Sequence, residues 1–499
     1  MKKFLYFLIH VWVVVLIIAL ITRFLSSMTN FACTYDYGWL LRSGYYIIEH
    51  KNIPCSDLFS WTFPEKSWIL YQWLFTVLFA LAHKFLGDEI LIRLFIVFVV
   101  LIYFFAPLFI NKTSNIPVLF TMLISSLALI VVSLNMSVRP LFFTTIFLMF
   151  QYVLIQRYKE DKIKFGNVLS LLVFVYILWG NIHTGVILGL LSLLLSALGD
   201  FFENKKLYLF SPPIAHIEGK SQKIKPYLVL ILFCFLGSLL NPYGFGIYTY
   251  LYNVSIQSYL NENIAELRPL DYHLTQYRYF AGLFFVYVIL FLKSFRVFSG
   301  SNFLHLLTFT IFMFCVQRFV IWTCLYYVLI LPKAIYQYLN LYKSNLINKI
   351  VYEFNNFKNF TLSCAVSVLV LFLFFPALFP PVKFGKCEDF RTGIESYNKL
   401  KLPSDRTFND PHIGSCSILF HPEQKVFIDT RFDFYGQNFT KDVFDSCFLT
   451  SKNTNEFFDK WQINTFFIHK NIPLAGYLAK DKDNKKIYED EKVVIFRKG

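Results

Sequence analysis

Long apolar runs recur through this chain of 499 residues and limit what it can fold into. A helix needs about 20 apolar residues to cross roughly 30 Å of hydrocarbon. Runs near that length cover residues 4–25, 69–86, 89–110, 117–134, 141–158, 168–198, 227–240, 279–292, 303–316, 319–336 and 360–378. The hydrophobic share of 56% is also well above that of a soluble domain. The sequence therefore predicts a polytopic α-helical membrane protein with about 10–12 spans.

Basic residues set the expected orientation of these spans. The net charge is +15, but the lysines and arginines are spread over several loops, which argues against a nucleic-acid surface. Loops with an excess of positive charge stay on the cytoplasmic side of the membrane. Four loops have such an excess, at residues 157–164, 205–225, 293–296 and 333–358.

Alternate crossing fits the second half of the chain better than the first. If 168–198 forms two short spans that turn at 181–185, residues 241–276 and the tail after 378 lie outside. In the first half, simple counting from a cytoplasmic Met1 puts Arg157 on the outer side. One early run, with 117–134 as the candidate, is therefore expected to be re-entrant or split. The run 4–25 is interpreted as a retained span, because no A-x-A-like cleavage site follows it.

The composition becomes more charged after residue 378. Alternating runs at 425–429 and 492–497 are typical of strands, and 455–461 is typical of a helix. We expect a transmembrane domain over 1–380 and a small extracytoplasmic α/β domain over 381–499.

The first outer loop, 26–68, is not expected to cross the membrane. Apolar and aromatic residues at helical spacing between 39 and 48 predict a helix lying in the membrane interface. Cysteines of this loop and of the tail could form disulfides or remain free, and the sequence leaves their connectivity open. They are Cys33, Cys55, Cys387, Cys416 and Cys447.

Aspartates of the first loop and of the tail are candidates for chemistry. Asp36 precedes the expected interfacial helix, where a partly desolvated carboxylate can act as a general base on a sugar hydroxyl; alternatively it interacts only with the helix dipole. Asp57 either caps a turn, orients an acceptor, or binds a divalent metal with Asp36. In the tail, "FIDTRFDFYG" contains Asp429, Arg431 and Asp433, which form either an acceptor-binding face or an ordinary salt bridge.

Polar residues at the outer ends of the spans form a second set of candidates. Asn181 and His183 lie in "WGNIHTG", at the expected turn, and are either functional or satisfied structural residues. Glu266 and Arg268 in "AELRP" pair with each other, or Arg268 binds a phosphate. Arg318 in "QRF" either reaches the lipid headgroups or holds a phosphate. No phosphate loop, H-E-x-x-H or CxxC motif supports nucleotide chemistry or structural zinc.

Taken in order, these segments resemble the bacterial GT-C superfamily of integral-membrane glycosyltransferases, in particular multi-span members with an extracytoplasmic C-terminal domain. The resemblance covers nearly the whole chain. Its segments are "DYGWLLRSGYYIIEHKNIPCSDLFSWT", "QWL", "WGNIHTGVILG", "NPYG", "IAELRP", "QRF" and "FNDPHIGSCSILFHPEQKVFIDTRFDFYG".

The resemblance implies an inverting sugar transferase of the bacterial plasma membrane. Its expected donor is a polyprenyl-phosphate sugar, its acceptor is a glycan, lipid or protein on the outer side, and a divalent metal is possible. Asp36 matches the position of the expected base. The matching residues for the leaving lipid phosphate are His183, Arg268 and Arg318, and the supporting or acceptor-binding residues are Asp57, Asn181 and Glu266.

The sequence departs from the family pattern at Leu40, Gln72 and Leu267, where a histidine, an acid and a tryptophan are expected. These departures put the charge network of the site in question and leave Asp36 intact. Two other classes of protein remain as alternatives. A transporter or flippase for lipid-linked sugars would show repeat symmetry and broken helices in both halves, and a non-catalytic scaffold would use its tail to bind a partner.

Overall fold

The computed structural model describes residues 34–112, 116, 118–133, 135–205, 223–271, 273–294, 297–341 and 385–499. The expected first and last spans, 4–25 and 360–378, lie outside these ranges, as does Cys33. The chain forms two compact units. Of the described residues, the helical unit contains those of 92–244 and 265–341, and the mixed unit contains 34–91, 245–264 and 385–499. The first outer loop thus belongs to the same unit as the tail.

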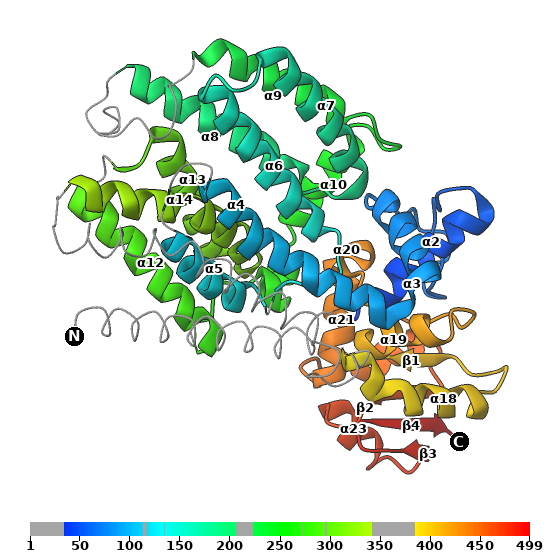
Figure 1. The fold of residues 1–499 in the computed structure, drawn as a ribbon. Coiled ribbons are helices and arrows are strands. Elements are labelled where there is room, and N and C mark those ends of the chain that lie inside the picture. The colour runs from blue at the N-terminus through cyan, green and yellow to red at the C-terminus, as the bar shows by residue number, and fades with distance from the viewer. Residues whose placement is uncertain are drawn as a thin grey trace. The chain divides into compact units, whose positions relative to one another are not determined.

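The helical unit is built from apolar helices (Figure 1). Its helices α6, α7, α8 and α9 pack side by side. Its elements are η1 (Leu101–Phe105), α4 (Ala106–Lys112), α5 (Val118–Val132), α6 (Leu141–Lys159), α7 (Phe165–Ile182), α8 (Val186–Asn204), α9 (Ile224–Ser238), η4 (Ala265–Leu267), α12 (Thr275–Ser294), α13 (Gly300–Cys315), η6 (Gln317–Phe319) and α14 (Val320–Leu341).

Within the described ranges, 5 helical segments are long and apolar enough to cross a membrane, and shorter apolar helices accompany them. The 5 segments are Trp73–Asn111, Leu141–Lys159, Phe165–Ile182, Val186–Asn204 and Gln317–Asn340. The protein is therefore an integral membrane protein, as the sequence predicts. Two short spans that turn near 181–185 are also confirmed, because α7 ends at Ile182 and α8 begins at Val186.

The run 117–134 was expected to be re-entrant or split. Helix α5 is continuous from Val118 to Val132, so a split is wrong, while the re-entrant alternative stays a prediction. The two runs predicted at 69–86 and 89–110 instead join in α3 (Trp73–Val100), η1 and α4, without a loop between them. The one non-helical residue inside α3 is Gly87, with φ 69° and ψ 174°. Glycine is nearly the only residue that adopts this conformation.

Polar side chains mark the two ends of the helical unit. Arg139 lies just before α6, and Lys159 is the last residue of that helix. Lys159 is buried and its ammonium lies 2.6 Å from Asp200 of α8, which also accepts a hydrogen bond from Tyr227 of α9 (2.8 Å). A buried ion pair needs such additional partners to offset its desolvation. The Lys159 end carries the basic loop 157–164 and is the expected cytoplasmic end.

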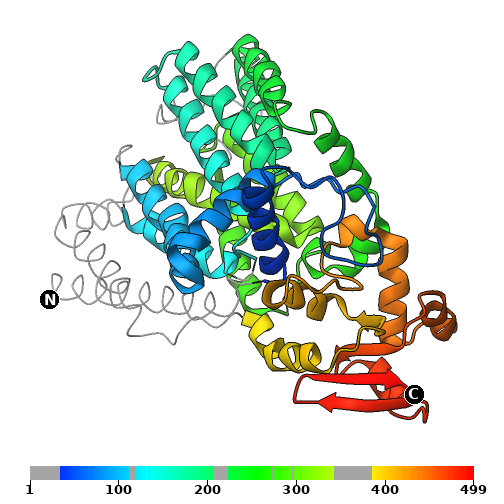
Figure 2. The same ribbon diagram turned by 90° about the vertical axis from the view of Figure 1, so that its right-hand side faces the viewer.

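The mixed unit combines short helices with one four-stranded sheet of order β1-β2-β4-β3, in which only the β1–β2 pair is parallel. In Figure 2, β3 and β4 form the antiparallel red ribbon near the C-terminus. The elements are α2 (Tyr37–His50), α10 (Gly246–Ser255), α11 (Ser258–Asn263), η7 (Gly385–Phe390), α18 (Arg391–Leu400), β1 (Thr407–Asn409), α19 (Pro411–Phe420), α20 (Phe432–Tyr435), α21 (Gln437–Phe448), α22 (Thr454–Lys460), β2 (Thr465–His469), α23 (Pro473–Leu478), β3 (Asn484–Glu489) and β4 (Val493–Lys498).

Two of the three elements expected in the tail are confirmed. The predicted strand at 492–497 is β4 and the predicted helix at 455–461 is α22. The predicted strand at 425–429 is wrong, because this segment does not join the sheet. It makes a single bridge to the first outer loop, where Val426 donates to the carbonyl of Phe59 (2.9 Å) and accepts from the amide of Trp61 (3.0 Å).

Helix α2 also differs from its expected environment. Its apolar residues Trp39, Leu40, Leu41 and Ile47 are at most 9% exposed, so protein rather than lipid covers them. A disulfide joins Cys387 to Cys416, while Cys55 and Cys447 are free thiols. A disulfide is typical of an oxidising compartment outside the cytoplasm.

A buried arginine connects the first outer loop to the tail within the mixed unit. The side chain of Arg431 is 1% exposed, and its guanidinium lies 2.7 Å from Asp57 and 2.6 Å from Asp429. The rings of Phe59, Trp68, Phe434 and Tyr435 surround the guanidinium carbon at 4.6–5.8 Å. Burial lowers the pKa of Arg431, but Asp429 outweighs this effect and raises it, so the arginine stays charged.

We expect Arg431→Ala to lower the free energy of unfolding of the mixed unit by about 3–5 kcal/mol, because it leaves two buried carboxylates without their cation. Chemical unfolding of the full chain in detergent, followed by tryptophan fluorescence, measures this change. Lys498→Ala is the control, since its ion pair with Asp459 is at the surface (3.4 Å) and is expected to contribute less than about 1 kcal/mol. Equal effects of the two variants would contradict the role of Arg431.

Candidate active site

Asp36 lies at the first turn of α2, within the mixed unit. Its Oδ1 accepts hydrogen bonds from Trp39 Nε1 (3.1 Å) and from Thr430 Oγ1 (2.6 Å), and the residue is half-buried. Its side chain does not cap the helix. The two donors fix the direction of this carboxylate, and one of them comes from the tail. An oriented, half-buried carboxylate of this kind can accept a proton from a hydroxyl.

A second acid belongs to the same surroundings. Asp433, in α20, accepts a hydrogen bond from the Tyr250 hydroxyl of α10. Burial raises the pKa of Asp433, and the negative charge of Asp36 raises it further, to about 6, although Lys66 acts in the opposite direction. Two acids of which one titrates near neutral pH are typical of sites that transfer protons. The sequence singled out Asp433 but did not connect it with Asp36.

Asp57 has a different environment. It is 5% exposed and accepts hydrogen bonds from the amides of Phe59 and Ser60, both at 3.0 Å, in addition to its contact with Arg431. This is the turn-capping alternative. Protein donors occupy its oxygens, so this carboxylate does not fit a metal shared with Asp36. Within the described ranges, no group of three or more His, Cys, Asp or Glu side chains is arranged to hold a metal ion.

Charged groups at the end of the helical unit opposite Lys159 form a second cluster. Glu266 of η4 lies between two arginines: Arg139 Nη1 donates to its Oε1 at 2.5 Å, and Arg318 Nη2 of η6 donates to its Oε2 at 2.5 Å. Burial alone would raise the pKa of Glu266, but the two guanidiniums outweigh it and hold the pKa at about 2. The side chain of Arg318 remains 36% exposed. Arg268 joins the cluster through its carbonyl, which accepts from the amide of Gln317 (2.8 Å).

His183 follows α7 and is part of the same end of the helical unit. Its Nδ1 accepts from the amide of Gly185 (3.0 Å) and lies 2.8 Å from the hydroxyl of Thr144, which itself accepts from Trp179 Nε1 (2.9 Å). Burial lowers the pKa of His183, and Arg318 lowers it further, to about 3. The imidazole is therefore neutral, with its proton on Nε2, and can donate a hydrogen bond but supplies no positive charge.

Asn181 has a structural contact. Its Nδ2 donates to the carbonyls of Ile177 and Leu240, both at 2.8 Å, and so ties the end of α7 to the end of α9. Sequence reasoning did not find Arg139, the second cation around Glu266. The available signal was an arginine followed by a proline at the start of an apolar run, the same pair that Arg268 forms with Pro269.

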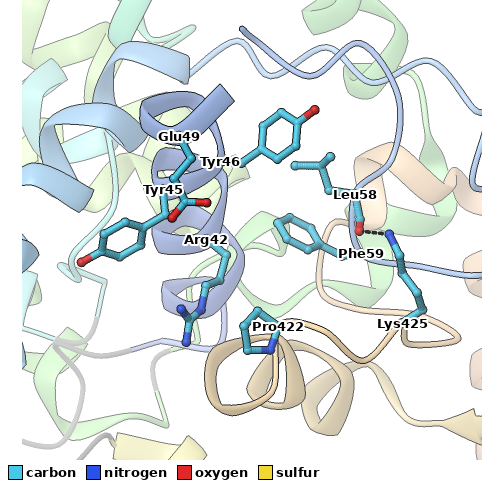
Figure 3. Close-up of a pocket in the computed structure, with 8 residues that line it drawn as sticks. All are labelled: Arg42, Tyr45, Tyr46, Glu49, Leu58, Phe59, Pro422 and Lys425. Carbon is cyan, nitrogen blue, oxygen red and sulfur yellow. Dashed lines mark hydrogen bonds between the residues drawn. The ribbon is translucent and has the colours of Figure 1, made fainter. Parts of the chain in front are cut away.

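A cavity of about 510 Å³ opens beside α2 in the mixed unit (Figure 3). In Figure 3, the rings of Tyr46, Phe59 and Pro422 face a common space. The residues around this space include both hydrogen-bond donors and hydrogen-bond acceptors. Arg42 Nη2 donates to the carbonyl of Leu419 (2.6 Å), while its buried Nε has no hydrogen-bond partner in the described part of the chain. The lining residues are Arg42, Tyr45, Tyr46, Glu49, Leu58, Phe59, Pro422 and Lys425.

The chain is similar to two solved structures from Archaeoglobus fulgidus. One is the oligosaccharyltransferase in the apo form, with 12% identity, a TM-score of 0.48 and coverage of 92% of this chain and 69% of that chain. The other is the oligosaccharyltransferase AglB in complex with an inhibitory peptide and a dolichol-phosphate, with 12% identity, a TM-score of 0.48 and coverage of 94% and 70%. A similarity of this size assigns no role to any residue here. No family model and no curated protein sequence matches the chain.

We expect Glu266→Gln to lower the free energy of unfolding of the helical unit by about 1–3 kcal/mol at pH 7, because two arginines lose a charged partner. The folded pKa of Glu266, about 2, lies below its usual 4.5. Its contribution is therefore fully present above about pH 4.5 and is lost as the pH falls towards 2. Thermal unfolding in detergent should show a large difference between variant and wild type at pH 7 and a smaller one at pH 3.

Glu160→Gln is the control for this prediction. Glu160 also pairs with a basic residue, Lys162 (2.7 Å), but the lysine is 55% exposed. A surface pair of this kind contributes little to stability. The prediction is contradicted if Glu266→Gln lowers the free energy of unfolding no more than Glu160→Gln, or if its effect does not change with pH. Either result would show that the ion pairs of Glu266 do not stabilise the helical unit.

Proposed function

We propose that the protein is a membrane glycosyltransferase that moves a sugar from a polyprenyl-phosphate donor to an acceptor on the outer side of the membrane. The observation that carries this proposal is the environment of Asp36. Its carboxylate is oriented by Trp39 and Thr430 and does not cap its helix. It also has a second acid, Asp433, close enough to shift the pKa of that group. Structural acids such as Asp57 are instead fully engaged by protein donors.

In the proposed reaction, Asp36 accepts the proton of an acceptor hydroxyl. The hydroxyl oxygen forms a bond with the anomeric carbon of the donor sugar, and the bond from that carbon to the phosphate oxygen breaks. The bonding electrons leave with the polyprenyl phosphate, and an in-line attack inverts the anomeric centre. Because the donor already carries the energy of this bond, no nucleotide site is required. Asp433, with a pKa near 6, is suited to take up or release a proton close to Asp36.

The arginines around Glu266 are proposed to hold the donor phosphate. Glu266 fixes two guanidiniums in place, and Arg318 is partly exposed, so its remaining hydrogen-bonding capacity can face a ligand. The neutral His183 adds a hydrogen-bond donor on Nε2. As the phosphate leaves, its negative charge grows, and each well-placed donor can contribute roughly 3–4 kcal/mol to the transition state.

The cavity beside α2 suggests a glycan acceptor. The C–H faces of a sugar ring pack against aromatic side chains, and its hydroxyls need both donors and acceptors. The cavity offers the rings of Tyr46 and Phe59, the exposed ammonium of Lys425 as a donor and the exposed carboxylate of Glu49 as an acceptor. The disulfide between Cys387 and Cys416 supports an extracytoplasmic tail. The plasma membrane of a bacterium is the proposed location.

We expect Asp36→Asn to reduce sugar transfer at least about 100-fold, because the amide cannot act as a base, while thermal stability changes little. The assay is transfer of radiolabelled sugar from a panel of polyprenyl-phosphate sugars in membranes containing the full chain. Asp57→Asn is the matched control in the same loop. It should lower stability, because it removes a partner of Arg431, and the surviving folded fraction should retain turnover. Wild-type activity in Asp36→Asn would refute the mechanism.

Tyr46→Ala should raise the KM for a glycan acceptor about 10-fold with little change in kcat, because one aromatic platform is worth about 1–2 kcal/mol. Steady-state kinetics with varied acceptor concentration separates the two constants. Tyr252→Ala is the control, since Tyr252 lies on α10, is 65% exposed and does not line the cavity. An unchanged KM in Tyr46→Ala would place the acceptor elsewhere.

A further inference from the structure

The segment Trp73–Asn111 is too long for a single crossing of the membrane. Its 39 residues would extend about 58 Å as a helix, whereas the hydrocarbon layer is roughly 30 Å thick and needs about 20 residues. No loop divides the segment, so it cannot form two spans. Only part of it crosses, and the rest must lie at one side of the membrane.

Charged residues show which part crosses. Residues 94–111 contain no charged side chain, while five titratable residues occur between 83 and 93. They are His83, Lys84, Asp88, Glu89 and Arg93. Counting about 20 residues back from Asn111 reaches Ile92, the residue at which the helical unit begins. The crossing therefore extends over roughly 92–111, with the charged group at its N-terminal end.

The first part of α3, residues 73–86, has two different faces. Phe75, Phe79 and Ala80 are buried, and Thr76 and Ala80 lie directly against Gly44 of α2. The other face is apolar and exposed. It consists of Leu78 (43%), Leu81 (36%), Phe85 (81%) and Leu86 (36%), at the spacing of one helical face. An apolar stripe of this kind in water would be costly, so it needs a non-aqueous partner.

The orientation of the basic loops agrees with a single crossing here. With 92–111 counted once, the shorter apolar helix α5 counted as a crossing and the run 4–25 counted from the sequence, four spans precede the loop at 157–164. This number places Arg157 on the cytoplasmic side, where the positive charge of its loop belongs. Counting 69–86 and 89–110 as two spans gave the opposite result.

We propose that residues 73–86 lie in the outer membrane–water interface with the stripe Leu78, Leu81, Phe85 and Leu86 in lipid, and that Gly87 joins this interfacial helix to the crossing helix. The partner is the lipid surface itself, since the stripe continues directly into a membrane-spanning segment. The positive φ of Gly87 gives the bend, and a Cβ at this position would have open space but the wrong backbone conformation.

The interfacial helix would also set the depth of the candidate base. Tyr37 of α2 donates to Asp88 (2.6 Å), and the Tyr45 hydroxyl lies 2.7 Å from His83 Nδ1. The His83 contact fixes α2, which starts beside Asp36, to the interfacial helix, and the Asp88 contact fixes it just after Gly87. The inference does not depend on the proposed reaction, because it rests on length, charge and exposure alone.

Depth measurements by electron paramagnetic resonance test the proposal. Nitroxide labels are attached through a genetically encoded keto amino acid, one at a time, at Leu78, Phe85, Leu94 and Leu101 of the full chain in lipid nanodiscs. All four side chains are exposed, so the labels do not disturb the core. Collision with oxygen and with a water-soluble nickel chelate reports the depth of each label. Positions 94 and 101 are the internal control, because seven residues of a crossing helix differ in depth by about 10 Å.

We expect labels at 78 and 85 to have nearly equal depths, about 5–10 Å below the headgroups, while 94 and 101 differ by about 10 Å. A depth difference of about 10 Å between 78 and 85 would show that this part also crosses the membrane and would overturn the proposal. High access of the nickel chelate at both positions would overturn it as well, by showing that the stripe faces water. Loss of glycosyl transfer plays no part in this test.

Discussion

The mixed unit depends on one buried cation. Arg431 lies between Asp57 of the first outer loop and Asp429 of the tail, with aromatic rings around its guanidinium. Removing water from a guanidinium and two carboxylates costs several kcal/mol per ion, and only close contacts among all three groups offset that cost. The same tail segment then supplies Thr430 to Asp36 and Asp433 to the acid pair. The ion pair thus fixes the tail segment that completes the surroundings of Asp36.

The helical unit also contains buried charged groups, which lie at its two ends. Polar groups within lipid need internal partners, because no water is available to them. At one end, Lys159, Asp200 and Tyr227 satisfy one another. At the other end, Glu266 holds Arg139 and Arg318, and His183 remains neutral. The first end is fully buried, whereas Arg318 stays partly exposed. This difference in exposure makes the Arg318 end the candidate for ligand binding.

Sequence reasoning succeeded where local pattern decides structure. The turn at 181–185 was predictable, because glycines and polar residues interrupt an apolar run. The runs 69–86 and 89–110 were predicted as separate spans, whereas the structure joins them in one helical segment with a kink at Gly87. The pairing of Arg139 with Glu266 was also out of reach, because the two residues are 127 positions apart and no periodicity connects them. The sequence singled out both Asp36 and Asp433, but only the fold shows that they lie in the same surroundings.

The first outer loop and the tail are made at very different times. Arg42 donates to the carbonyl of Leu419, which follows it by 377 residues, and Asp57 likewise waits for Arg431. At a synthesis rate of about 5–20 residues per second, roughly 20–75 s pass between the synthesis of the loop and that of its partner segment in the tail. During that interval the Asp57 carboxylate and the aromatic rings of the loop lack the contacts that the tail later provides. A nascent chain of this kind is a natural client for chaperones that shield unfinished domains.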